Sequence, residues 1–195
     1  MTTVSPDFRF DASHERAQNI RCLVLDVDGV LTSGKLIYDG AGDCSREFDI
    51  HDGFGIRLFR EFIGPVALIS GKASEATAAR ARELKIEHLF LGSKDKRGDL
   101  DKLMQRIGCT AAEVAAMGDD WPDLPMLQRC GLAIAPANAV REVRDAAHWV
   151  TTRSGGDGAV REAIERILQG QRRWQDALQR YGATGPANQA VRETA

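Results

Sequence analysis

The stretch Leu23-Val24-Leu25-Asp26-Val27-Asp28-Gly29-Val30-Leu31-Thr32 has the pattern of a buried strand that ends in two carboxylates and a glycine. A continuous apolar run of this kind is typical of a strand covered on both faces, as in a parallel sheet. Ligands of open α/β sheets bind at the carboxyl ends of the strands, so we expect Asp26 and Asp28 in a crevice. Two carboxylates there cost free energy unless a positive group neutralises them, which predicts a metal ion or another cation beside them.

Similar apolar runs recur along the chain and alternate with stretches of helical period. The predicted strands are residues 20–25, 66–69, 88–91, 114–117, 132–134 and 148–150. The predicted helices are residues 55–62, 73–84, 98–107 and 124–129, followed by a final helix over about 158–181. This alternation predicts an α/β fold with a Rossmann-like, doubly wound parallel sheet and right-handed crossovers.

Residues 35–50 interrupt this alternation. Two short strand-like pieces, Leu36-Ile37-Tyr38 and Arg46-Glu47-Phe48, flank a turn rich in Gly and Asp. The pattern predicts a β-hairpin inserted after the first strand, where a connection normally has only two to six residues. Such a hairpin at the mouth of the sheet is either a lid or an assembly surface.

The length of 195 residues fits one domain with a substantial core. We expect an N-terminal extension over residues 1–19, one α/β domain over residues 20–169, and a C-terminal helix and mobile tail over residues 170–195.

Composition narrows the classes of function. The formal net charge is −2 and no long basic block occurs, which argues against a nucleic-acid partner. The apolar runs are far too short to span a membrane, and the polar start does not resemble a secretory signal. The four cysteines are widely spaced, as in reduced cytoplasmic proteins: Cys22, Cys44, Cys109 and Cys130.

Three further strand ends carry polar side chains. Ser70 and Gly71 follow the second predicted strand, Lys96 comes shortly after the third, and Gly118-Asp119-Asp120 follows the fourth, with Asp123 close behind. Each taken alone has a structural alternative, such as a helix cap or a solvated charge. Their occurrence together, each after an apolar strand, argues against those alternatives.

In this order the four motifs resemble those of the haloacid dehalogenase superfamily, over residues 21–168. The resemblance implies a hydrolase that works through a covalent aspartyl intermediate. It implies that Asp26 is the nucleophile and Asp28 the general acid and base. It also implies that Ser70 holds a phosphoryl oxygen and that Lys96 steadies the nucleophile and the phosphate.

The same resemblance implies a magnesium site. Its ligands would be Asp26, Asp119 and the backbone carbonyl of Asp28, and Mg²⁺ accepts such a small set of oxygen ligands because it keeps several waters. Asp120 and Asp123 could support the metal through water or contact the substrate.

The spacing of the motifs leaves no room for a separate cap domain, which indicates the capless subclass. The finer resemblance is to the 3-deoxy-D-manno-octulosonate 8-phosphate phosphatases, through residues 26–32, 52–56, 118–120 and 155–162. It implies a sugar-acid phosphate as the substrate, in lipopolysaccharide precursor synthesis, and a homotetramer built through the hairpin of residues 35–50. It further implies that the segment after Gln169 gates the active site.

Four residues are candidates for contact with the substrate: Asp52, Gly71, Lys72 and Asp120. The octulosonate enzymes usually have an arginine at the position of Lys72, and a lysine cannot grip a carboxylate with a planar fork. A nonulosonate (sialic-acid-like) 9-phosphate or another small sugar phosphate is therefore an alternative substrate. A non-catalytic binding module is the third possibility, and the complete set of motif residues argues against it.

Overall fold

A computed structural model describes residues 12–38 and 44–183 of the chain. Its main sheet has six strands in the order β5-β4-β1-β6-β7-β8, and every neighbouring pair is parallel. The strands are β1 (Cys22–Leu25), β4 (Val66–Ser70), β5 (His88–Leu91), β6 (Val114–Met117), β7 (Leu132–Ala135) and β8 (Trp149–Val150). From the central β1 the chain winds first to one side and then to the other, so the predicted doubly wound parallel sheet is confirmed.

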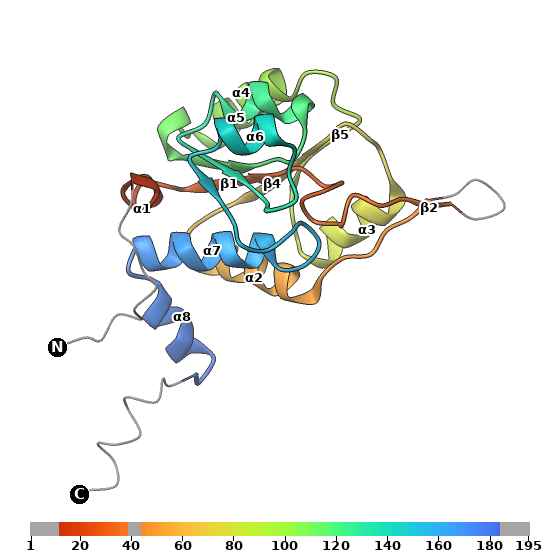
Figure 1. Cartoon of the computed structure of the whole chain (residues 1–195). Helices are drawn as coiled ribbons and strands as arrows, with labels where there is room; N and C mark the ends of the chain where they lie inside the picture. The colour runs from red at the N-terminus through yellow and green to blue at the C-terminus, as the bar shows by residue number, and fades with distance from the viewer. Residues whose placement is uncertain (1–11, 39–43, 184–195) are drawn as a thin grey trace, which may run out of the picture.

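Helices cover both faces of this sheet, as Figure 1 shows. One layer holds α2 (Ile50–Phe62), α3 (Glu75–Glu83) and α7 (Ala159–Gly170); the other holds α4 (Lys96–Ile107), α5 (Leu124–Leu127) and α6 (Arg141–Ala146). Side chains alternate along β1, so that Leu23 and Leu25 belong to the core under α2 and α7 while Val24 belongs to the core under α4. Helices therefore bury both faces of the sheet, which explains why the sequence of β1 is apolar without interruption.

Helix α2 begins five residues earlier than the predicted 55–62. Asp49 caps it, because its carboxylate accepts hydrogen bonds from the backbone N–H groups of His51 and Asp52. Two glycines in the first turns of α2 weaken the helical pattern of the sequence, so the predicted helix began too late. A Cβ on Gly55 would lie 3.2 Å from the Cα of Arg161, so the close packing of α2 against α7 requires a small residue there.

The prediction of one helix over 158–181 is wrong. Helix α7 ends at Gly170, and α8 (Trp174–Arg180) starts after a turn in which Arg172 has a φ of 59°. The backbone N–H of Arg173 donates to the carbonyl of Leu168 at 2.8 Å, which closes the turn in the manner of a Schellman motif. The side chain of Gln171 donates to the carbonyls of Ala17 and Ile20, so contact with the N-terminal segment accompanies the break.

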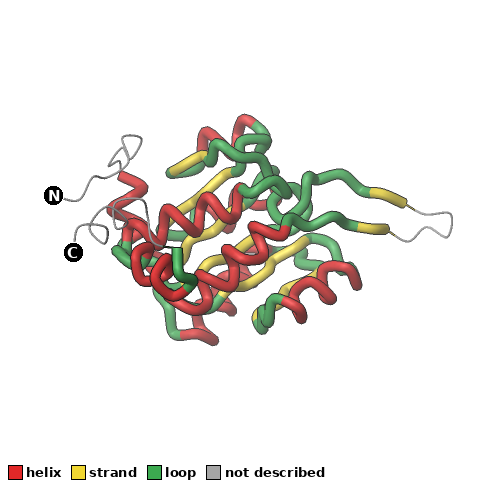
Figure 2. The backbone as a smooth tube through the Cα atoms, turned by 90° about the horizontal axis from the view of Figure 1, so that it is seen from below, coloured by secondary structure: helices red, strands yellow, loops and turns green. Residues whose placement is uncertain are grey.

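The inserted hairpin is present as an antiparallel pair, β2 (Ile37–Tyr38) and β3 (Cys44–Ser45). It projects away from the sheet, as seen in Figure 2, and its turn at residues 39–43 lies outside the described residues. Ile37 and Tyr38 are 62% and 63% exposed. Within the described part of the chain no cap domain interrupts the fold, as predicted.

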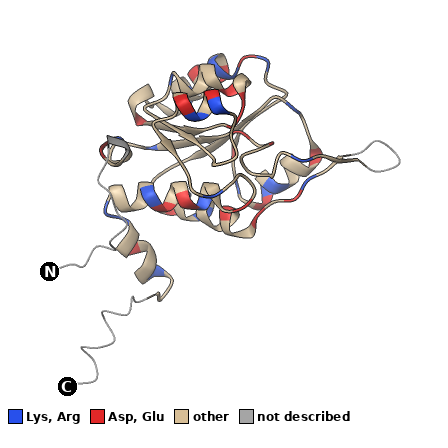
Figure 3. Ribbon diagram, viewed as in Figure 1, with Lys and Arg blue, Asp and Glu red and all other residues tan. Residues whose placement is uncertain are grey.

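The N-terminal extension contributes a short helix, α1 (Ala12–Ala17), which packs against α7. Residues 184–195, where a mobile tail was predicted, lie outside the described residues. Among the helices of residues 12–38 and 44–183, none is long and apolar enough to cross a membrane. In the view of Figure 3, basic and acidic residues occur together on the helices of both layers.

Candidate active site

The polar motif residues meet where the central strands end. Leu25 of β1 pairs with Leu68 of β4 on one side and with Met117 of β6 on the other. Asp26 follows directly after Leu25, and Ser70 closes β4. The parallel register therefore brings the first, second and fourth motifs to one edge of the sheet, as predicted.

Lys96 joins two of these motifs. Its Nζ lies 2.7 Å from Oδ1 of Asp26 and 2.5 Å from Oδ1 of Asp123. Lys96 is the first residue of α4, and the side chain of Asp95 caps that helix by accepting from the N–H of Gly98. All three residues are nearly buried: Lys96 is 8% exposed, Asp26 is 6% exposed and Asp123 is 1% exposed. A buried charge needs partners of this kind, so the arrangement holds all three in place.

Two glycines allow the acidic loops to come close together. Oδ2 of Asp123 accepts from the backbone N–H groups of Asp119 (2.9 Å) and Asp120 (3.2 Å), which folds the loop after β6 back on itself. A Cβ on Gly118 would collide with the side chain of Asp123. Gly29 has a φ of +100°, and a Cβ there would collide with the carboxylate of Asp119. The glycines of the motifs thus make room for carboxylates.

The electrostatics of this cluster reflect burial and crowding. Burial, followed by repulsion from Asp123, raises the pKa of Asp26 to about 6 even though Lys96 opposes the shift. Burial, followed by repulsion from Asp26 and Asp123, raises the pKa of Asp119 to about 7. Burial by itself would lower the pKa of Lys96, but attraction to Asp26 and Asp123 outweighs it and the pKa is raised. The cluster therefore holds more negative than positive charge.

These carboxylates fit a divalent metal ion. One ligand oxygen from each of Asp26, Asp119 and Asp123 lies within 4.8 Å of the others. Oxygen-only donors with excess negative charge suit Mg²⁺, a hard cation. Asp123 thus belongs to the cluster, whereas the sequence had left its role open between support of the metal and contact with the substrate.

The carboxylate of Asp28 lies apart from this cluster and binds Arg46 instead. Nε of Arg46 donates to Oδ1 at 2.7 Å, and Nη2 donates to Oδ2 at 3.1 Å. Arg46 follows β3, so the base of the hairpin contacts the nucleophile loop. Sequence reasoning missed Arg46 as a site residue; its only signal was a lone basic side chain in the returning half of the hairpin.

The second motif lies beside a hollow. Ser70 is 2% exposed, and its Oγ accepts from the backbone N–H of Lys72 at 3.3 Å. Gly71 and Lys72 are exposed, and Lys72 lines the hollow together with Arg46. Two predicted substrate contacts are therefore accessible next to the buried serine.

The other two predicted substrate residues have different surroundings. Asp52 is 1% exposed, and its Oδ1 accepts from the N–H of Arg161 at 2.7 Å at the start of α7. Burial raises its pKa to about 6. In this structure Asp52 joins two helices and its side chain is buried, which does not favour the predicted contact with a substrate. Asp120 is exposed, and its Oδ1 accepts from the N–H of Trp121 at 2.7 Å.

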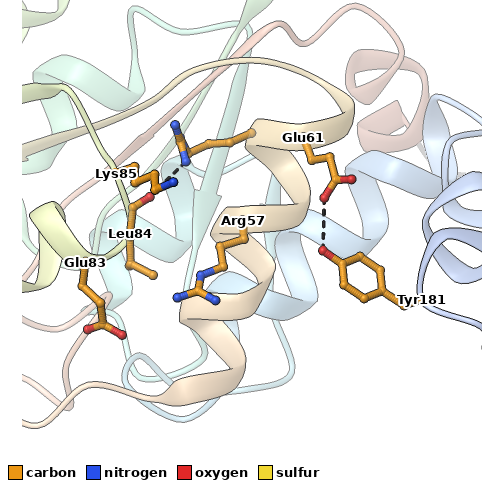
Figure 4. A pocket seen from close by; sticks show the side chains of 7 residues that line it. Arg57, Glu61, Glu83, Leu84, Lys85 and Tyr181 are labelled. Atoms are coloured by element: carbon orange, nitrogen blue, oxygen red, sulfur yellow. Dashed lines mark hydrogen bonds between the residues drawn. The ribbon is translucent and has the colours of Figure 1, made fainter.

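A separate groove of about 460 Å³ lies between α2, the end of α3 and α8, and Figure 4 shows it from close by. Arg57, Arg60 and Lys85 line it, together with Glu61, whose carboxylate accepts from the hydroxyl of Tyr181 at 3.1 Å. Helix α2 ends beside it and leads into the start of β4, so the groove lies toward the opposite edge of the sheet. None of the motif residues lines it.

Comparison with known proteins agrees with this geometry. The sequence profile of the haloacid dehalogenase-like hydrolases matches residues 73–164. The 3-deoxy-D-manno-octulosonate 8-phosphate phosphatase of Haemophilus influenzae is 39% identical over 157 residues, which cover 80% of this chain and 87% of that protein. The Yersinia pestis phosphatase of the same name is also 39% identical, over 88% of each chain. The chain belongs to this family of phosphatases.

A solved structure extends the family likeness to the whole fold. The Moraxella catarrhalis 3-deoxy-D-manno-octulosonate 8-phosphate phosphatase, in complex with a magnesium ion, a phosphate ion and 3-deoxy-D-manno-octulosonate (KDO), superposes with a TM-score of 0.86 at 32% identity. The match covers 89% of this chain and 99% of that one. Membership of this phosphatase family makes the chain a phosphatase of the haloacid dehalogenase superfamily, as the motifs predicted.

Proposed function

We propose that this protein is a magnesium-dependent phosphatase that removes phosphate from 3-deoxy-D-manno-octulosonate 8-phosphate. The observation that carries the proposal is the contact of Lys96 with both Asp26 and Asp123, beside Asp119, in a chain of this family. The relatives named above act on this sugar-acid phosphate or hold its product together with magnesium and phosphate.

The first step would transfer the phosphoryl group to the protein. Oδ2 of Asp26, which Lys96 leaves free, attacks phosphorus while the bond between phosphorus and the sugar oxygen breaks. Asp28 donates a proton to the leaving oxygen. Lys96 and the hydroxyl of Ser70 stabilise the charge that develops on the phosphoryl oxygens. The products of this step are the free sugar acid and an aspartyl-phosphate.

The second step would return Asp26 to its starting state. Asp28, now ionised, takes a proton from water as the water oxygen attacks the phosphorus of the aspartyl-phosphate. The bond between phosphorus and the Asp26 oxygen breaks, and inorganic phosphate leaves. Asp26, Asp119 and the backbone carbonyl of Asp28 would hold Mg²⁺, with Asp123 beside them in the cluster. The ion would neutralise the negative charge that otherwise repels a carboxylate from a phosphate dianion.

Around this core, Gly71, Lys72 and Asp120 are the proposed substrate contacts, and all three are exposed at the sheet edge. We further propose that the enzyme works in the cytoplasm as a homotetramer assembled through the hairpin of residues 35–50, whose apolar Ile37 and Tyr38 are well exposed. The proposed domain limits stay 1–19, 20–169 and 170–195.

The presence of Lys72 favours a second candidate, hydrolysis of a nonulosonate 9-phosphate. Phosphate release with Mg²⁺ should be measured against octulosonate 8-phosphate, nonulosonate 9-phosphates and common sugar phosphates, with Asp26→Asn as the control. We expect octulosonate 8-phosphate to give the highest kcat/KM and Asp26→Asn to abolish release. A preference for another phosphate would overturn the substrate, and absence of turnover by folded protein would overturn the activity.

A further inference from the structure

Arg46 is the most heavily engaged side chain near the site that the mechanism above does not use. Its guanidinium binds both oxygens of Asp28, at 2.7 and 3.1 Å, and its Nη1 donates to Oγ of Ser74 at 2.6 Å. Only 4% of its side chain is exposed, against 22% for Asp28. Ser74 in turn caps α3. Arg46 thus ties the hairpin to the nucleophile loop and to the helix after the second motif.

This contact conflicts with the role proposed for Asp28. Both oxygens of Asp28 accept hydrogen bonds from one guanidinium, so neither points toward a leaving group. A general acid must instead turn one of its oxygens to the leaving oxygen. While the pair with Arg46 is intact, Asp28 is therefore held away from its first task. Something must draw Arg46 aside before the first step.

The hollow next to Arg46 indicates what that group is. It measures about 630 Å³ and is lined by Arg46, Lys72, Ser74 and Glu75, with Tyr38 and Cys44 on the hairpin side. Within the described part of the chain, the ammonium group of Lys72 has no ion-pair partner. Arg46 and Lys72 outweigh the single carboxylate of Glu75 in the lining of this hollow, which favours an anionic ligand, and the planar guanidinium of Arg46 matches a carboxylate.

We propose that Arg46 is a specificity-determining latch, which exchanges the carboxylate of Asp28 for the carboxylate of the substrate. The sugar acid enters with its carboxylate toward Arg46 and Lys72, Arg46 turns to it, and the side chain of Asp28 is released to face the leaving oxygen. No covalent bond changes in this exchange. One carboxylate replaces another on the same guanidinium, so few hydrogen bonds are lost overall.

The latch gives selectivity that a simple pocket would lack. A phosphate ester without a second anionic group cannot displace Asp28, so it meets an active site whose acid is still bound. The latch also accounts for Lys72, because the planar fork missing at that position is supplied by Arg46 from the hairpin. This inference rests on the proposed function, since it assigns the substrate's carboxylate to a particular side chain.

The test compares two substrates in three proteins. Wild type, Arg46→Gln and Arg46→Lys are assayed with octulosonate 8-phosphate and with glucose 6-phosphate, which has no carboxylate. Because charge-assisted hydrogen bonds are lost, Arg46→Gln should lower kcat/KM for the sugar acid about 10- to 100-fold, mainly through KM. It should raise kcat for glucose 6-phosphate, because Asp28 is no longer held by Arg46, and an unchanged kcat for this substrate would contradict the latch. Arg46→Lys should be intermediate on the sugar acid.

Arg129→Gln is the matched control, because Arg129 also pairs with an aspartate, Asp101, at 3.1 Å but outside the site. Arg129→Gln should leave kcat/KM unchanged for both substrates. An equal loss on both substrates with Arg46→Gln, or no loss on either, would overturn the latch. Circular dichroism of both Arg46 variants identifies unfolding, and Arg46→Lys decides the matter if the glutamine variant does not fold.

A binding measurement separates failure of the latch from failure of the proposed function. Calorimetric titration with free 3-deoxy-D-manno-octulosonate, which needs no turnover, should show binding to wild type that weakens about tenfold or more in Arg46→Gln. Equal binding to both proteins would overturn the latch even if wild type is an active phosphatase. Wild type that neither binds the sugar acid nor hydrolyses its phosphate would overturn both proposals.

Discussion

Asp26 and Asp52 are both nearly buried carboxylates, 6% and 1% exposed, and burial raises the pKa of each to about 6. Their surroundings differ. Asp26 meets a lysine that follows the third predicted strand and two carboxylates that follow the fourth. Asp52 meets backbone N–H groups at the start of α7.

The difference teaches how to recognise the working site in this fold. Burial and a shifted pKa are common to both places, so neither identifies a catalytic group. Of these two places, it is at Asp26 that side chains of both charge signs converge at the ends of several strands. The two regions should therefore respond oppositely to mutation: the Asp26 region in activity, and the Asp52 region in stability.

The largest expected effect is that of Asp26→Asn. Loss of the nucleophile should lower kcat by at least about 10⁴-fold, since no other group can form the covalent intermediate. The free energy of unfolding without magnesium should not fall, because the change removes one of several crowded carboxylates. Steady-state kinetics and urea unfolding measure the two effects. If Asp26→Asn kept wild-type activity, Asp26 would not be the nucleophile, and the functional contrast with Asp52 would fail.

Lys96→Met should affect both properties. It leaves Asp26 and Asp123 buried without their cation, which should cost about 3–5 kcal/mol of stability without magnesium. The loss of positive charge at the phosphate should also lower kcat by about 10²–10³-fold. Urea unfolding with and without Mg²⁺ is the measurement, and Mg²⁺ should restore part of the stability. A variant as stable as wild type would contradict the bridging role of Lys96.

Magnesium should stabilise the folded protein through the Asp26 region alone. At 100 times the dissociation constant, a ligand that binds only the folded state contributes about 2.7 kcal/mol. The midpoint temperature of thermal unfolding should therefore rise with Mg²⁺ in wild type and in Asp52→Asn, and rise much less in Asp119→Asn. Chelation should reverse the shift. An equal shift in all three proteins would place the ion elsewhere.

The pH dependence of stability should reveal Asp52. Its pKa in the folded protein is about 6, above the ordinary 3.8, so the folded state binds more protons between these values and stability falls as pH rises through them. Relative to Asp52→Asn, wild type should lose about 1–3 kcal/mol between pH 4 and pH 7. Urea unfolding at several pH values measures the difference, which cancels the contributions of the other carboxylates. If the free energy of unfolding changed equally with pH in wild type and in Asp52→Asn, the pKa of Asp52 would not be raised by burial.

The smallest effect is that of Asp52→Ala. Loss of the hydrogen bond to the start of α7 should cost about 1–2 kcal/mol of stability at pH 5. The same variant should keep kcat within about twofold of wild type, because the carboxylate of Asp52 is buried between α2 and α7. Asp157→Ala, a surface change near the same helix start, is the control. A large drop in kcat with unchanged stability would return Asp52 to the active site.

Much of this structure could be predicted from local sequence. The predicted runs at 88–91 and 114–117 coincide with β5 and β6, because apolar side chains on both faces leave a continuous signal. Asp26, Ser70, Lys96 and Asp119 could be grouped in advance, since residues that follow parallel strands share one edge of the sheet.

The remaining features depend on partners far along the chain. Asp52 accepts a hydrogen bond from a backbone N–H group 109 residues away. Local sequence does not show that a carboxylate will cap a helix so far along the chain. The break after α7 is accompanied by bonds from Gln171 to carbonyls near α1. Arg46 reaches Asp28 only because the hairpin returns its chain to the nucleophile loop. Long-range pairing of this kind leaves no periodic pattern to read.

The central claim is that Asp26 carries the phosphoryl group between the two steps. The most direct test is to mix wild-type protein with Mg²⁺ and labelled octulosonate 8-phosphate, to quench in acid within milliseconds, before the second step is complete, and to map the peptides by mass spectrometry. We predict a phosphoryl group on the peptide that contains Asp26, lost on treatment with base and missing from Asp26→Asn. Phosphate release by wild type with no label on Asp26, or a label on another residue, would contradict the account.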